Sequence, residues 1–153
     1  MDKDLIMEDY KGFLENLECK VIDNVKGSDI KMFNPTMLAY IGDAVYELFV
    51  RTFLVSKGSS QAGKLHKKAV LFVKAKAQAE IIDKISEYLT EEEKDVVRRG
   101  RNAKTTSMPK NAELAYYKHA TGFEALLGYL YLNNHIDRLL QIMNYIPNII
   151  EEK

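Results

Sequence analysis

Apolar residues recur every three or four positions along nearly the whole chain, the spacing that turns one face of an α-helix toward a protein core. Polar clusters with Gly or Pro separate these periodic segments. No segment shows the strict alternation typical of a β-strand. The pattern predicts one all-α domain with helices at about residues 3–18, 35–58, 61–73, 75–89, 90–101, 111–132 and 134–146.

Local signals mark several of the predicted helix ends. Asn34 followed by Pro35 is typical of a helix start, and Gly58 is typical of the end of that helix. Ser59 or Ser60 is expected to cap the next helix.

Two further signals mark the start of one later helix and the end of another. Thr90 and Glu93 have the spacing of a capping box, in which each residue bonds the backbone of the other. Pro147 lacks a backbone N–H and is expected to stop the last helix at residue 146.

The segment "LAYIGDAVYELF" is an apolar helix with an acid near its middle. A carboxylate among apolar residues is costly unless something compensates it. Glu47 has a partner, since Arg51 follows four residues later in the favourable order. Asp43 has no such partner, because position 39 is Ala and position 47 is acidic.

A second apolar helix, containing "FEALLGYLYL", repeats this arrangement. Glu124 is its isolated acid, with Ala120 and Gly128 four residues to either side. Three glycines lie close to the two acids: Gly42, Gly122 and Gly128. Glycine costs roughly 0.5–1 kcal/mol relative to Ala inside a helix, and close approach of another backbone would offset that cost. We therefore expect the two helices to cross at these small residues.

Such a crossing would bring Asp43 and Glu124 near one another. Two carboxylates repel in a low dielectric unless one is protonated, a basic side chain reaches them, or a divalent cation binds between them. Mg²⁺ suits a pair of oxygen ligands, with water and phosphate completing its shell. The alternative is that a buried tyrosine, a lysine or backbone groups satisfy each acid separately.

The two acidic helices resemble those of the ribonuclease III catalytic domain. "LAYIGDAVYEL" is similar to its signature helix, and "FEALLGYLYL" is similar to its second acidic helix. With "LHKKAVLFVKAKAQAE", "EEEKDVVRRGRNAK" and "PKNAELAYYKHATGFEALLGYLYL" in the same order, the resemblance narrows to the Mini-ribonuclease III subfamily. It is strongest over residues 33–140, and it implies a single catalytic domain over 1–153 without a separate double-stranded-RNA-binding domain.

The resemblance implies a ribonuclease III-like helical bundle of six or seven helices that acts as a homodimer. It implies Mg²⁺-dependent cleavage of double-stranded RNA, with Mn²⁺ as a substitute, leaving 5′-phosphate and 3′-hydroxyl ends. The role associated with the subfamily is maturation of the 23S ribosomal RNA precursor, with possible assistance from a ribosomal protein. Asp43 matches the signature aspartate and Glu124 the essential glutamate, both as catalytic metal ligands.

Two positions depart from the pattern of full-length ribonuclease III. A glutamate usually stands four residues before the signature aspartate, where this chain has Ala39. An aspartate usually stands three residues before the second glutamate, where this chain has Thr121. The Mini subfamily shares this simplification, so we expect a more hydrated Mg²⁺ shell in which the Thr121 hydroxyl holds a metal-bound water.

Charge is segregated along the chain although the net charge is zero. Residues 57–118 carry 14 basic and 8 acidic side chains, and no acid lies between Asp95 and Glu113. Cations that face phosphates release counterions, so this stretch is the expected RNA contact, together with the loop 102–110. Its cations are Arg98, Arg99, Arg101, Lys104 and Lys110. A second candidate surface contains Lys64, His66, Lys67 and Lys68.

Composition favours a cytoplasmic location. The N-terminus lacks the basic and apolar regions of a signal peptide, and no apolar run approaches the length of a membrane span. The single Cys19 excludes a disulfide within the chain. Two other classes of function stay open at this point: a non-catalytic RNA-binding or ribosome-assembly module on the same fold, and a helical protein-interaction domain.

Overall fold

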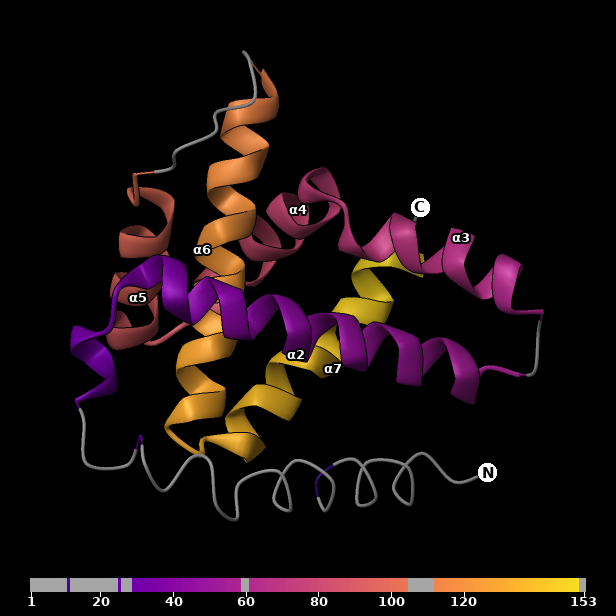
Figure 1. Ribbon diagram of the computed structural model, residues 1–153, viewed down its shortest axis with the longest axis horizontal. Coiled ribbons are helices and arrows are strands. Elements are labelled where there is room, and N and C mark those ends of the chain that lie inside the picture. The colour runs from indigo at the N-terminus through magenta and orange to yellow at the C-terminus, as the bar shows by residue number, and fades with distance from the viewer. Residues whose placement is uncertain (1–10, 12–24, 26–28, 59–60, 105–111, 152–153) are drawn as a thin grey trace.

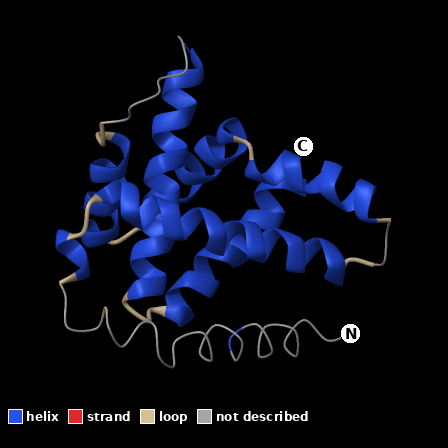
Figure 2. Cartoon of the chain, in the orientation of Figure 1, coloured by secondary structure: helices blue, strands red, loops and turns tan. Residues whose placement is uncertain are grey.

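A computed structural model describes residues 11, 25, 29–58, 61–104 and 112–151. These residues form α-helices and two short 3-10 helices, and no strand occurs among them (Figure 2). In chain order the elements are η2 (Ile30–Met32), α2 (Pro35–Ser56), α3 (Ala62–Val73), α4 (Ala75–Ile85), η3 (Ser86–Tyr88), α5 (Glu91–Arg101), α6 (Ala112–Leu132) and α7 (Ile136–Glu151). The all-α prediction is confirmed, while the helix expected at 3–18 lies outside the described residues.

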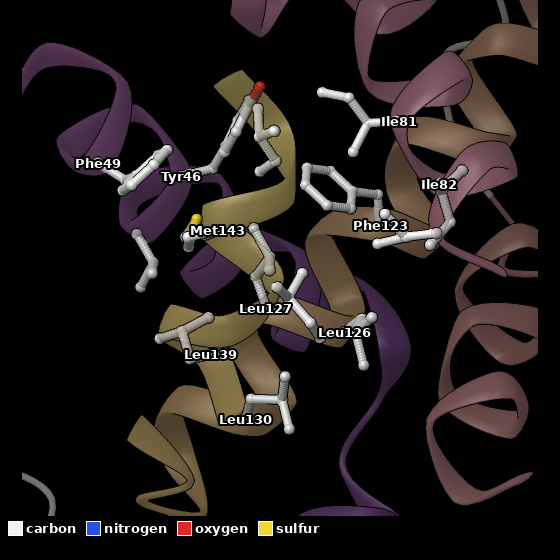
Figure 3. Packing of buried hydrophobic residues seen from close by; sticks show 14 of the residues in the cluster. Tyr46, Phe49, Ile81, Ile82, Phe123, Leu126, Leu127, Leu130, Leu139 and Met143 are labelled. Atoms are coloured by element: carbon white, nitrogen blue, oxygen red, sulfur yellow. The ribbon is translucent and has the colours of Figure 1, made fainter. Parts of the chain in front are cut away.

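Helix α6 is the central element of the bundle. It packs against α2, α4 and α5 along its length and against α7 near its C-terminal end, and Figure 1 shows α2 crossing it near the middle of the molecule. Figure 3 shows Phe123 of α6 beside Ile81 and Ile82 of α4. The ring of Phe123 also meets the ring of Tyr46 edge-on, with centroids 5.1 Å apart. This core holds α2, α4 and α6 in fixed relation to one another.

The predicted start of α2 is confirmed. The Asn34 side chain accepts a hydrogen bond from the Thr36 backbone N–H at 3.0 Å, and Pro35 occupies the first helical position. At the other end, Gly58 has φ +131°, a conformation that side chains rarely adopt. The cap of α3 was wrongly predicted, since Gln61 is the N-cap and makes no side-chain capping bond.

The capping box at the start of α5 is also present. The Glu93 backbone N–H donates to Thr90 Oγ1 at 3.2 Å, and the Thr90 N–H donates to Glu93 Oε2 at 2.9 Å. The last helix was wrongly predicted to stop at residue 146, because α7 continues through Pro147 to Glu151. Ile146 and Ile149 on either side of the proline are buried, and their burial offsets the lost backbone hydrogen bond.

Helix α2 turns part of its apolar sequence outward. Met37 is 57% exposed and Tyr40 is 80% exposed, whereas Leu38, Val45 and Phe49 are buried. Across the described residues, no helix combines the length and apolar character that crossing a bilayer requires.

Candidate active site

The crossing of α2 and α6 is a contact between two backbones. A Cβ added to Gly42 would lie 1.7 Å from the Glu124 backbone oxygen, and one added to Gly128 would lie 1.9 Å from the Leu38 backbone oxygen. Any side chain at either position would therefore separate the helices. This is the close approach that the glycines predict.

Gly122 serves a second contact of the same helix. A Cβ at this position would lie 2.8 Å from the backbone oxygen of Val97 in α5, and one at Gly100 would lie 2.8 Å from Gly122 Cα. Small residues thus let α6 approach α2 and α5 closely. The rest of the surface of α6 carries residues of the core and residues of the pocket described next.

The crossing places Asp43 and Glu124 in one pocket of about 360 Å³. The pocket is also lined by residues of α2 that precede Asp43, by the last residue of α3, and by residues of α4 and α6. The remaining lining residues are Thr36, Ala39, Tyr40, Val73, Ala75, Gln78, Tyr117, Ala120 and Thr121. The meeting of the two acids is thus observed as the sequence predicts.

Asp43 is not the buried residue that its apolar surroundings in the sequence implied. It is exposed at the rim of the pocket, beside the exposed Tyr40, while Glu124 is only half-buried. The reason is geometric: α2 presents one face to α6, and Asp43 lies on the edge of that face. Asp43 is therefore accessible to a ligand from solvent.

Both carboxyl groups are shifted toward the neutral form. Burial raises the pKa of Glu124 to about 8, and the negative charge of Asp43 adds to this shift. Partial burial and the charge of Glu47 raise the pKa of Asp43, while a hydrogen bond with Glu124 opposes that change. Among the described residues no cation acts on either carboxyl group, and a bound cation would relieve the repulsion between them.

The two departures from the four-acid pattern both lie in this pocket. Ala39 brings only a methyl group, while Thr121 is buried and its hydroxyl donates to the Tyr117 carbonyl at 2.9 Å. The Thr121 oxygen keeps lone pairs with which to accept a hydrogen bond from water. Within the described ranges, no group of three His, Cys, Asp or Glu side chains is placed to hold a metal.

The predicted RNA-contacting arginines occupy the last turn of α5, in different situations. Arg98 is exposed and donates to Asp95 Oδ1 at 2.5 Å within the same helix. Arg101 and Lys104 are exposed. All three are free to face phosphates, since an exposed ion pair such as that of Arg98 holds it only weakly.

Arg99, in the same basic stretch, is bonded to the backbone of a distant part of the chain. Its guanidinium donates to the carbonyl of Lys31 at 2.5 Å and to the carbonyl of Phe33 at 3.0 Å. Arg99 therefore fixes the segment that leads into α2. Lys110 lies outside the described residues, as does most of the predicted loop 102–110.

The second candidate surface lies on α3. Lys64, His66, Lys67 and Lys68 are all exposed there. The helix thus leaves this cluster accessible and buries none of it.

Sequence reasoning missed Gln78 as a residue of the pocket. Its side chain is 1% exposed and lines the same cavity as the two acids. A signal was available, because Gln78 falls on the apolar face of its helix with Ile81, Ile82 and Ile85. A polar side chain on such a face is buried and needs hydrogen-bond partners.

Comparison with known proteins gives a consistent result. Residues 36–135 match the family described as the Ribonuclease III domain. A Mini-ribonuclease 3 from Thermoanaerobacter sp. is 49% identical over 92% of this chain and 96% of its own length. A Mini-ribonuclease 3 from Clostridium tetani is 52% identical over 81% of this chain and 83% of its own length.

A solved structure supports the fold. The crystal structure of a protein from Fusobacterium nucleatum superposes with a TM-score of 0.71 at 33% sequence identity, covering 79% of this chain and 97% of that one. The family match spans both acidic helices and the pocket between them. On the strength of these matches and of the paired acids, the chain belongs to the Mini-ribonuclease III family.

Proposed function

We propose that this endoribonuclease cuts double-stranded RNA by Mg²⁺-dependent hydrolysis, leaving 5′-phosphate and 3′-hydroxyl ends. The observation that carries the proposal is the pair of Asp43 and Glu124 in one open pocket, where burial and the charge of Asp43 raise the pKa of Glu124, and burial and the charge of Glu47 raise the pKa of Asp43. A bound cation would stabilise the ionised form of both carboxyl groups. Family membership supports the choice of RNA as the polymer.

The donor set of the pocket fits Mg²⁺. Its candidate ligands are the carboxylate oxygens of Asp43 and Glu124, with the Thr121 hydroxyl in reach of a metal-bound water. All are hard oxygen donors, which Mg²⁺ and Mn²⁺ prefer and which a structural zinc site lacks. When bound, the cation would activate a water for attack and neutralise charge on the phosphoryl oxygens.

The chain itself would supply binding and orientation. Asp43 is accessible at the rim, so a phosphodiester can approach it without any helix moving. Glu124 is held by the α2–α6 crossing, and the exposed Arg98, Arg101 and Lys104 offer contacts to phosphates farther along the duplex. Duplex RNA is recognised mainly through shape, phosphates and 2′-hydroxyls, which suits such contacts.

The biological role that we propose is maturation of the 23S ribosomal RNA precursor in the cytoplasm by a homodimer, with possible ribosomal protein assistance. This part of the proposal rests on the likeness of the sequence segments to the Mini subfamily. It adds no requirement to the chemistry of the pocket.

A cleavage assay on labelled duplex RNA tests the activity. Asp43→Asn and Glu124→Gln should each lower the rate by about 100- to 1,000-fold, as expected when a group that stabilises transition-state charge is lost. Glu91→Gln is the control, since Glu91 is exposed on α5, pairs with Lys94 at 3.1 Å and lies outside the pocket. Full activity in both active-site variants would contradict the proposal.

A second candidate function is non-catalytic RNA binding, and the absence of acids at Ala39 and Thr121 favours it. It predicts salt-sensitive binding of duplex RNA with no Mg²⁺-dependent cutting. Under either function, Arg98→Ala and Arg101→Ala should each reduce the slope of log affinity against log salt by about 1. Arg99→Ala should instead lower stability, because it removes the bonds to Lys31 and Phe33.

A further inference from the structure

Gln78 is a buried polar residue whose position neither the core nor the chain fold requires. It lies in the first turns of α4, is 1% exposed, and lines the pocket that holds Asp43 and Glu124. An apolar side chain would fill this space without the cost of burying an amide. The amide is therefore retained for its hydrogen bonds.

The nitrogen of the Gln78 amide is anchored on the backbone. Nε2 donates to the Val73 carbonyl at 2.9 Å, which satisfies one of the unpaired carbonyls at the C-terminal end of α3. The same side chain lines the pocket with Glu124 and lowers the pKa of its carboxyl group, against the burial that raises it. One amide group thus lies between the glutamate of α6 and the junction of α3 with α4.

The bond to the Val73 carbonyl fixes the orientation of the amide. Turning it over would set Oε1 against the Val73 carbonyl oxygen, and two acceptors cannot share a hydrogen bond. The Gln78 Oε1 atom is accordingly left without a donor, and it is the one buried side-chain atom in this condition within the described part of the chain. Leaving a buried acceptor unpaired is destabilising, so a donor is expected in the functional state.

The neighbouring protein groups do not supply that donor. The Thr121 hydroxyl already donates to Tyr117, and once a bound cation holds Asp43 and Glu124 ionised, neither carboxylate has a proton to give. A water molecule is the remaining donor in an open pocket of this volume. Mg²⁺ sites built on two carboxylates keep several waters, each of which donates hydrogen bonds outward.

Building on the proposed function, we propose that Gln78 is a positioning residue of the active site. Its Nε2 holds the Glu124 carboxylate in place, and its Oε1 accepts a hydrogen bond from a water in the hydration shell of the bound cation. The amide thus acts on the cation through Glu124 and through water. It compensates in part for the acids that Ala39 and Thr121 replace.

Divalent-cation binding to the RNA-free protein tests this role separately from activity. Gln78→Met keeps the unbranched shape and removes both the donor and the acceptor, and we expect Mn²⁺ affinity measured by EPR titration to fall about 10- to 100-fold. The midpoint of RNA cleavage against Mg²⁺ concentration should rise correspondingly, with most of the rate restored at high Mg²⁺. Gln61→Leu is the control, since Gln61 is exposed and makes no capping bond.

Gln78→Glu separates the acceptor from the donor. It keeps oxygen acceptors in the pocket, so it should bind Mn²⁺ more tightly than Gln78→Met. Should Gln78→Met fail to fold, as judged by circular dichroism, Gln78→Glu carries the test and should bind Mn²⁺ at least as tightly as the wild type.

Several results would overturn the inference. These are a folded Gln78→Met with unchanged Mn²⁺ affinity and Mg²⁺ midpoint, and a Gln78→Glu as weak as Gln78→Met or weaker than the wild type. A wild-type protein whose Mn²⁺ binding is insensitive to Asp43→Asn and Glu124→Gln would overturn the proposed function itself. The two failures are thus distinguishable.

Discussion

Two glutamates of this protein are removed from bulk water in opposite ways. Glu93, at the start of α5, is 5% exposed and is held by Arg138 of α7, whose Nε donates to Oε1 at 2.7 Å and whose Nη2 donates to Oε2 at 2.9 Å. Burial raises the pKa of Glu93, but the bonds from Arg138 and from the Thr90 backbone outweigh it, so the pKa lies below its ordinary value.

Glu124 has no such counter-charge among the described residues. Its neighbour in the pocket is the like-charged Asp43, and its pKa rises to about 8. A carboxylate with a structural role is neutralised by the fold, whereas this one is left for something outside the chain to neutralise. The presence of a counter-charge therefore distinguishes the structural carboxylate of Glu93 from the functional carboxylate of Glu124 more clearly than the degree of burial does.

Removing the counter-charge of Glu93 should have the largest effect on stability. Arg138→Met leaves a buried carboxylate uncompensated and also loses the bond to the Tyr88 carbonyl, so we expect the free energy of unfolding to fall by about 3–5 kcal/mol in urea denaturation. The double variant Glu93→Gln/Arg138→Met should recover a large part of this loss. Equal losses in the single and double variants would show that the ion pair is not the cause.

A substitution at the helix crossing that positions Glu124 should lower the free energy of unfolding nearly as much. Gly42→Ala forces a methyl group against the Glu124 backbone, and we expect it to destabilise the protein by about 3 kcal/mol. Gly63→Ala is the matched control, because nothing lies within 4 Å of its Cβ and the change to Ala in a helix should stabilise by up to about 1 kcal/mol. Similar thermal shifts for the two variants would contradict the backbone contact.

The two glutamates should also give opposite dependences of stability on pH. Glu124 titrates near 8 in the folded protein and near 4.5 when unfolded, so without metal it makes stability fall as the pH rises through that interval. Glu93 has the lowered pKa, so its contribution is lost only as the pH falls below about 4.5.

Glu124→Gln should flatten the fall at neutral pH. Because Glu124 is half-buried and water reaches it, we expect the gain at pH 8 to be on the order of 1–2 kcal/mol. Urea denaturation at a series of pH values in EDTA measures it. If the stability of the wild type and that of Glu124→Gln changed in parallel between pH 5 and pH 8, Glu124 could not be the group responsible for the fall.

Addition of Mg²⁺ should give the smallest of these changes in the free energy of unfolding. Mg²⁺ at ten times its dissociation constant is expected to stabilise the wild type by about 1.4 kcal/mol through mass action, seen as a rise in Tm near pH 8. Asp43→Asn should not respond, whereas Arg138→Met should respond as the wild type does. A response that survives in Asp43→Asn would place the cation elsewhere.

The sequence was sufficient for the fold class and for the meeting of the acids, because both depend on local pattern. Helical periodicity located α2 to α7, and glycine at 42 and 128 signalled a close crossing. Asp43 was misjudged, since exposure depends on which face of α2 meets α6 and periodicity does not specify this. The end of α7 was missed because the packing of Ile146 and Ile149 overrides the local preference of Pro147.

The hydrogen-bond partners of Arg99 and Gln78 could not be predicted from the local sequence pattern either. Arg99 lies among cations that read as one RNA-binding stretch, but its guanidinium reaches carbonyls 66 and 68 residues away in the sequence. Gln78 was visible as a polar residue on an apolar face, yet its bond to Val73 and its place in the pocket beside Glu124 depend on how the helices pack. Such long-range contacts follow from the assembled bundle.

The backbone contact at Gly42 and Gly128 has a consequence for motion. Because Asp43 directly follows Gly42, and the Glu124 carbonyl touches that glycine, the two acids lie at a direct contact between two helix backbones, where close packing leaves little room for motion. The amide hydrogens around this crossing should therefore exchange with solvent only when the whole domain unfolds. The same backbone contact thus positions the catalytic acids and couples their surroundings to the unfolding of the whole domain, so loosening it should affect both.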